Sequence, residues 1–151
     1  MHVPEFSETK LIRPLRVLYR DPELVVVDKP AGLPVHRGFS KARDVAMMRV
    51  RDALGRHVYP VHRLDSGTSG VLVFALSSEV AALMGRAFEQ QAVKKLYVGL
   101  VRGVPPSKLV IDHPVPSREE RSSPRVPART SIELVESFGR YSLILARPST
   151  G

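Results

Sequence analysis

The hydrophobic pattern between residues 77 and 91 is the clearest helical signal in the chain. Apolar side chains recur there at i, i+3, i+4, i+7 and i+8, a spacing that places them on one face of an α-helix. Ser77 and Ser78 precede this run and are favourable N-cap residues. The pattern predicts a helix from Glu79 to Gln91 with its apolar face in the core. The residues of that face are Val80, Leu83, Met84, Ala87 and Phe88.

Runs of aliphatic residues between turn-forming residues predict six strands. The run from Gly70 to Leu76 is apolar on both faces, as in the interior of a sheet. The run from Lys94 to Gly103 alternates instead, with three aliphatic side chains on one face. Its other face carries Lys95, Tyr97 and Gly99. The predicted strands are residues 16–19, 24–28, 70–76, 94–103, 130–136 and 141–146.

The remaining segments are less regular. Lys29 to Gly38 contains two prolines and two glycines and is predicted to be a loop. Ser40 to Leu54 has a helical pattern, with apolar residues on one face and most arginines elsewhere. The stretch from Val104 to Arg129 is predicted to be either an irregular insertion or a pair of short surface strands. Residues 1–14 are predicted to form an N-terminal arm, and 15–151 one domain.

Composition narrows the class of protein. Hydrophobic residues make up 43% of the chain and charged residues 25%, as in ordinary soluble globular proteins. The chain has neither an apolar run of about 20 residues, which a membrane span requires, nor a secretory signal pattern, so a cytoplasmic protein is expected. The lack of cysteine excludes disulfides and thiolate chemistry. No two of the five histidines have the spacing of a helical metal site, so no metal is expected.

The net charge of +8 favours a polyanionic partner, because each phosphate that a basic residue neutralises releases a counterion. Arginine outnumbers lysine 17 to 6, which suits bidentate phosphate contacts and stacking on bases. A merely basic surface explains the charge equally well. The basic residues are densest between His36 and Arg56, and this cluster comprises Arg37, Lys41, Arg43, Arg49, Arg51 and Arg56.

The stretch VHRLDSGTSG, residues 61–70, holds the candidate chemistry. Taken alone, Asp65 is best explained as a turn residue whose carboxylate accepts backbone N–H groups. Arg63 two residues earlier could instead form a rigid pair with an ionised Asp65, which is the state that nucleophilic attack requires. Lys95 and Tyr97 could supply a cation and a flat surface for an RNA base, although Tyr97 could equally be a core residue. The pattern GTSG lacks the spacing of a phosphate-binding P-loop, and the chain has no GxSxG elbow.

The sequence HRLDSGTSGVLVFA, residues 62–75, closely resembles the HRLDxxTSG signature of the RluA-type pseudouridine synthases. The stretches LVVVDKPAGLPVH, KKLYVGLVRG and RPSTG match this family in the expected order, so the resemblance covers residues 16–151. The segment HRGFSKARDVAMMRVRDALGRHVYPVHRLD looks most like the subgroup named tRNA pseudouridine synthase C. The resemblance implies an α+β fold: a mixed, mainly antiparallel sheet with flanking helices. It also implies an isomerase that acts on RNA, with tRNA favoured over ribosomal RNA, and that needs no cofactor.

The resemblance also assigns roles to residues. Asp65 matches the catalytic aspartate, which attacks either uracil C6 or ribose C1′. Arg63 matches the arginine that orders the active site and RNA, and Tyr97 the tyrosine that packs against the flipped base. Beside these family roles, His62 and Lys95 are predicted from their positions to bind the substrate.

One difference from the family concerns the end of the chain. Family members continue with a G-R-x-H-Q-[IL]-R motif, whose arginine pairs with the catalytic aspartate, and the printed sequence stops at Gly151. The chain is therefore expected to be a C-terminally truncated fragment with impaired catalysis. The alternative function is a non-catalytic RNA-binding module.

Overall fold

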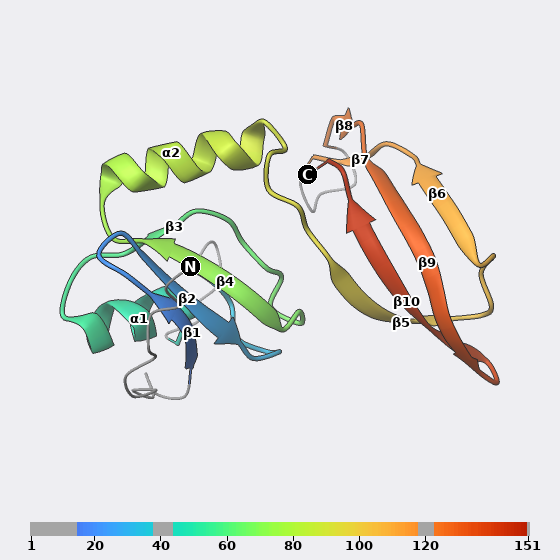
Figure 1. The fold of residues 1–151 in the computed structure, drawn as a ribbon, viewed down its shortest axis with the longest axis horizontal. Coiled ribbons are helices and arrows are strands. Elements are labelled where there is room, and N and C mark those ends of the chain that lie inside the picture. The colour runs from blue at the N-terminus through green and yellow to red at the C-terminus, as the bar shows by residue number, and fades with distance from the viewer. Residues whose placement is uncertain (1–14, 38–43, 118–122, 151) are drawn as a thin grey trace, which may run out of the picture. The chain divides into compact units, whose positions relative to one another are not determined.

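The structure is a computed structural model that describes residues 15–37, 44–117 and 123–150. The predicted arm, residues 1–14, lies outside these ranges. Contacts divide the chain into two units, Met1–Glu89 and Gln90–Gly151, each with its own sheet (Figure 1). Every strand pair among the described residues is antiparallel. Two helices accompany the sheets, and the predicted α+β class is confirmed.

The first unit contains a four-stranded sheet in the order β1-β2-β4-β3. The turn between β1 and β2 is closed by Asp21, whose Oδ1 accepts the amides of Glu23 and Leu24 at 2.8 and 2.6 Å. Alternate residues of β2 and β4 point into the core, where Val27 and Phe74 are fully buried. Three of these strands were predicted, and the short β3 was not. The strands are β1 (Arg16–Arg20), β2 (Leu24–Lys29), β3 (Tyr59–Pro60) and β4 (Gly70–Ala75).

Helix α1 (Ala46–Leu54) is shorter than the predicted helix from Ser40 to Leu54. Residues 40–43 of that prediction lie outside the described residues, and at Asp44 and Val45 the prediction is wrong. Val45 is the N-cap, and it has extended backbone and no side chain that could accept a helix amide. Gly55 ends the helix in the left-handed conformation at φ 63°.

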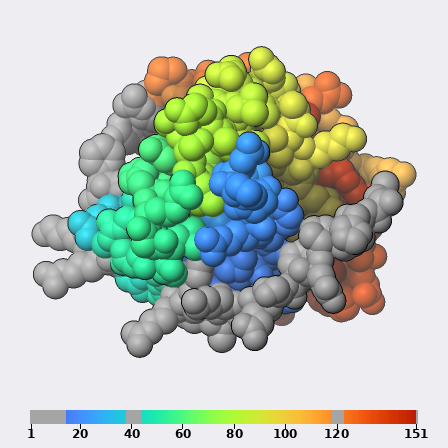
Figure 2. Space-filling model, turned by 60° about the vertical axis from the view of Figure 1, so that its left-hand side comes forward, coloured from blue at the N-terminus to red at the C-terminus, as the bar shows by residue number. Residues whose placement is uncertain are grey.

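Helix α2 (Ser78–Glu89) confirms the predicted helix except at its end, which lies at Glu89 and not at Gln91, a residue with a left-handed φ of 58°. The predicted N-cap is confirmed, because the Val80 amide donates to Ser77 Oγ at 3.2 Å. The prediction that its apolar face lies in the core is wrong. No residue of α2 is buried, and Leu83 is 60% exposed. The helix packs mainly against β4 and β3, and β3 has two residues, so this edge of the sheet offers the helix little surface. Figure 2 shows α2 (yellow-green) at the surface of this unit.

The second unit contains a four-stranded sheet in the order β5-β10-β9-β6 and a separate pair, β7 and β8. The predicted strands 130–136 and 141–146 are confirmed as β9 and β10, and the predicted strand 94–103 is confirmed as β5 only from Tyr97 on. Lys95 precedes β5, so the prediction that Lys95 shares a strand face with Tyr97 is wrong. The pair of short strands predicted within 104–129 exists as β7 and β8, and β6 additionally joins the main sheet. The strands are β5 (Tyr97–Arg102), β6 (Lys108–Asp112), β7 (Val115–Pro116), β8 (Arg125–Val126), β9 (Arg129–Phe138) and β10 (Tyr141–Pro148).

The two faces of this sheet differ in exposure. One face buries Ile132, Ser142 and Ile144. The opposite face exposes the aliphatic stripe of β5, where Val98 and Leu100 are 67% and 65% exposed. Neither helix among the described residues is long and apolar enough to cross a membrane.

Candidate active site

Asp65 lies in the connection between β3 and β4, which carries the HRLDSGTSG stretch. The turn is closed by the Thr68 amide, which donates to the backbone carbonyl of Asp65 at 3.0 Å. Among the described residues, the Asp65 carboxylate accepts no backbone hydrogen bond, and the side chain is 82% exposed. The carboxylate therefore does not serve its own turn, as an Asx turn requires, and remains available for chemistry.

Arg63 is an ionic partner of this carboxylate. Arg63 Nη2 lies 3.8 Å from Asp65 Oδ1, and the arginine side chain is 62% exposed. At this distance the contact is an ion pair without a hydrogen bond, and two exposed groups hold each other weakly. The predicted pairing is therefore present, but the predicted rigidity has to come from the backbone of the turn.

The backbone after Asp65 is held from the first half of the unit. The Ser66 carbonyl accepts the Gly32 amide at 2.7 Å and Lys29 Nζ at 3.2 Å. Lys29 Nζ also donates to the carbonyls of Leu33 at 2.7 Å and Pro30 at 3.0 Å. One ammonium group thus ties the loop after β2 to the turn that carries Asp65.

The side chain of Lys29 is fully buried, with all three of its donors satisfied by carbonyls. Burial lowers the pKa of Lys29, and the negative charge of Asp65 acts in the opposite direction. Sequence reasoning missed this residue. The signal was the alternation in β2, because Val25, Val27 and Lys29 share one strand face and all three are buried.

The backbone before Asp65 is held by His62. The Val73 amide of β4 donates to His62 Nε2 at 3.1 Å. The imidazole also stacks on Phe88 of α2, with ring centroids 4.9 Å apart and planes 22° apart. Burial lowers the pKa of His62, and a hydrogen bond with the Arg63 backbone opposes this shift.

The other two predicted site residues lie in the second unit. Tyr97 begins β5 opposite Ala146 and is half-buried. Lys95 Nζ donates to the Thr150 carbonyl at 3.1 Å, so this ammonium holds the segment that follows β10. Thr150 is held from a second side, because its Oγ1 accepts the Arg129 amide at 2.8 Å.

The predicted basic cluster is largely engaged within the chain. Arg49 is paired with Asp44, and Arg51 Nη2 lies 2.6 Å from Asp52 Oδ1. Arg56 Nη2 donates to the Leu76 carbonyl at 2.6 Å, at the end of β4. Lys41 and Arg43 lie outside the described residues. The described arginines of this cluster therefore offer fewer phosphate contacts than their number indicates.

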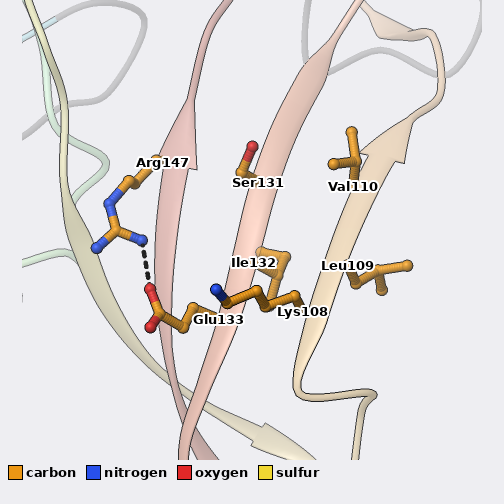
Figure 3. Close-up of a pocket in the computed structure, with 7 residues that line it drawn as sticks. All are labelled: Lys108, Leu109, Val110, Ser131, Ile132, Glu133 and Arg147. Atoms are coloured by element: carbon orange, nitrogen blue, oxygen red, sulfur yellow. Dashed lines mark hydrogen bonds and ion pairs between the residues drawn. The ribbon is translucent and has the colours of Figure 1, made fainter.

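A shallow hollow on the second unit is lined by none of the predicted site residues (Figure 3). Its floor is formed by β6, β9 and β10, and the Arg147–Glu133 ion pair, 3.0 Å long, lies across it. Among the described residues no three histidine, aspartate or glutamate side chains group as a metal site would need. The hollow is lined by Lys108, Leu109, Val110, Ser131, Ile132, Glu133 and Arg147.

Comparison with known proteins gives one consistent result. Residues 23–151 match the family described as RNA pseudouridylate synthase. The chain is 41% identical over 157 residues to tRNA pseudouridine synthase C of Haemophilus ducreyi, covering 91% of this chain and 65% of the relative. The corresponding protein of Haemophilus influenzae is 40% identical over 158 residues, covering 91% of this chain and 66% of the relative.

A solved structure agrees with these relatives. Human RNA Pseudouridylate Synthase Domain Containing 4 matches with a TM-score of 0.72 and 30% identity, over 89% of this chain and 59% of that chain. The chain thus spans just under two thirds of the length of these matched proteins.

Proposed function

Because this chain belongs to the RNA pseudouridylate synthase family, we propose that the protein converts a specific uridine of RNA to pseudouridine, with Asp65 as the nucleophile. One observation carries the proposal: the carboxylate of the matching HRLDSGTSG turn is 82% exposed and accepts no hydrogen bond from its own turn among the described residues. The acid is presented outward on a turn that is itself held on both sides by backbone hydrogen bonds.

The reaction is an isomerisation, so every atom of the uridine is retained. Asp65 attacks uracil C6 or ribose C1′, and the bond between C1′ and N1 breaks. The detached uracil turns, C5 bonds to C1′ and the bond to Asp65 is released. C5 then loses a proton while N1, which is no longer bonded to C1′, takes one up, so the composition of the nucleoside is unchanged. An aspartate can do this without a metal, because the carboxylate is a nucleophile when ionised.

Arg63 and Tyr97 are proposed to contact the RNA. Arg63 is a largely exposed guanidinium at the end of the catalytic turn, and a guanidinium suits phosphate oxygens or the face of a base. Tyr97 offers an aromatic surface on which an unstacked base can pack. His62 and Lys95, in contrast, already have backbone partners, the Val73 amide and the Thr150 carbonyl, and are proposed to hold the site around the substrate.

The substrate proposed here is tRNA, since the relatives at 40% and 41% identity carry that substrate in their names. A tRNA substrate would place the reaction in the cytoplasm. A non-catalytic RNA-binding module is the second candidate, and the net charge of +8 favours it, because binding to phosphates requires basic residues and no nucleophile.

Measuring turnover distinguishes the pseudouridine synthase from the non-catalytic RNA-binding module. The experiment incubates the protein with unmodified tRNA and with a ribosomal RNA fragment, and measures pseudouridine by mass spectrometry of the digested RNA. The proposal predicts conversion of one uridine in tRNA. Binding of tRNA without any conversion would instead support the binding module, and conversion of the ribosomal fragment alone would overturn the tRNA assignment.

A further inference from the structure

We propose that His62 is a positioning residue for Asp65. The neutral imidazole of His62 accepts a hydrogen bond inside the unit and does not touch the substrate. The inference rests on the proposed function and concerns the same site. The observation behind it is that the His62 ring has a protein partner at Nε2 and another across its face, the Val73 amide and Phe88.

The Val73 amide needs this acceptor because β3 is short. β3 pairs with β4 only at Ala75 and Phe74, and ends at Pro60. Backbone amides of alternate residues in a strand point to the same side. The Val73 amide therefore points to the same side as the Ala75 amide, which is the side where β3 lies. No strand residue of β3 reaches Val73, and the imidazole of His62 supplies the missing acceptor.

This contact fixes the protonation state of the ring. A nitrogen that accepts a hydrogen bond carries no proton, so a neutral His62 has its proton on Nδ1. A doubly protonated ring would present an N–H group to the Val73 amide, and the contact would be lost. Stacking on Phe88 fixes the ring plane as well, so that the imidazole cannot turn Nε2 toward a substrate without leaving α2.

The position of His62 in the chain connects this contact to the chemistry. His62 lies three residues before Asp65, and the Ser66 carbonyl, one residue after Asp65, is held by Gly32 and Lys29. The turn is therefore fixed at both ends, while the Asp65 carboxylate itself is exposed and forms a long ion pair with Arg63. Loss of the His62 contact would free one end and let the carboxylate shift relative to the reacting uridine.

The test uses His62→Phe, which keeps a stacked ring and removes the acceptor, and His62→Gln, which supplies a carbonyl oxygen close to the position of Nε2. His57→Phe is the matched control, since His57 is an exposed histidine of the same unit with an edge contact to Tyr59. Pseudouridine formation in tRNA gives kcat and KM for each protein. A 1H–15N spectrum of the imidazoles and amide exchange at Val73 report the contact directly.

The inference predicts an unprotonated Nε2 in His62 and fast amide exchange at Val73 in His62→Phe only. It also predicts that kcat falls about 10- to 100-fold in His62→Phe with KM nearly unchanged, because a small misplacement of a catalytic group is costly. His62→Gln should recover most of kcat. A protonated Nε2, or a raised KM with unchanged kcat, would overturn the inference. If the unaltered protein makes no pseudouridine, the proposed function fails, while the spectrum and the exchange rates still decide the role of His62.

Discussion

The amide nitrogen of Gly32 lies 2.7 Å from the carbonyl oxygen of Ser66, so that the loop after β2 is hydrogen-bonded to the turn that carries Asp65. Gly32 has a φ of 86°, a conformation that glycine adopts without strain and other residues rarely do. Gly32 and Ser66 are 34 residues apart in the sequence. Lys29 Nζ also donates to the Ser66 carbonyl and so reinforces this contact. The position of Asp65 thus depends on the last residue of β2 and on the loop that follows it.

Lys29→Met should destabilise the protein by about 1–3 kcal/mol. Methionine fills a similar space and removes the ammonium group, which leaves the carbonyl of Leu33 buried without its closest donor. Urea unfolding followed by circular dichroism measures the change. Lys108→Met is the matched control, because Lys108 is exposed on β6, and it should change stability by less than about 0.5 kcal/mol. Equal stability of Lys29→Met and the unaltered protein would contradict the role given to Lys29.

Ser77→Ala should destabilise α2 by about 1 kcal/mol, because it removes the oxygen that accepts the Val80 amide in the first turn. Thermal unfolding followed at 222 nm measures this loss. Ser131→Ala, which removes an exposed hydroxyl from β9, provides the comparison and should leave the unfolding temperature unchanged. The N-cap assignment is wrong if both substitutions have the same small effect.

The stability of the protein should fall as the pH is lowered below about 6.5, the ordinary pKa of histidine. Burial lowers the pKa of His62 in the folded state, so the unfolded chain binds a proton first, and acid favours unfolding between the two pKa values. Urea midpoints between pH 5 and 8 measure this slope. Other groups titrate as well, and the informative quantity is the difference from His62→Gln, which should show a shallower loss. Identical slopes would show that His62 takes up its proton equally easily in both states.

Binding of tRNA should weaken as the salt concentration rises. The slope of the logarithm of the binding constant against the logarithm of the salt concentration steepens by about 0.7 to 0.9 for each phosphate contact. Arg63→Ala should reduce the slope by about one contact if Arg63 binds a phosphate. Arg51 is already paired with Asp52, so Arg51→Ala serves as the control and should leave the slope unchanged. Fluorescence titration at several salt concentrations provides the slopes. An equal reduction of the slope in both variants would mean that Arg63 contributes no more to phosphate binding than any other exposed arginine.

Much of the fold could be predicted from the sequence because its signals are local. Aliphatic runs between turn-forming residues located six of the strands, and the 3.6-residue period with Ser77 located α2. The prediction that the apolar face of α2 is buried failed for a non-local reason. The sequence of a helix does not specify how much surface the neighbouring sheet offers it. The start of the first helix was misplaced because Asp44 and Val45 have no sequence feature that forbids a helix.

The candidate site, too, could be predicted from the sequence only where its contacts are local. The motif located Asp65 and Arg63, whose contact spans two residues. The partners that hold the turn are Gly32, Lys29, Val73 and Phe88, which are distant in sequence, and only the alternation of β2 could have pointed to Lys29. The turn itself could be predicted, whereas the use of its carboxylate could not, because either the side chain or the backbone of Asp65 can accept the closing hydrogen bond.

The most direct test of the account is pseudouridine formation by Asp65→Asn, measured in tRNA by mass spectrometry beside Asp112→Asn. Asparagine keeps the shape of the side chain and lacks the charge needed for attack. Asp112 is an exposed carboxylate on β6 and controls for the general loss of one negative charge. The account predicts no detectable conversion by Asp65→Asn, with tRNA binding retained, and unchanged conversion by Asp112→Asn. Conversion by Asp65→Asn at the rate of the unaltered protein would contradict it.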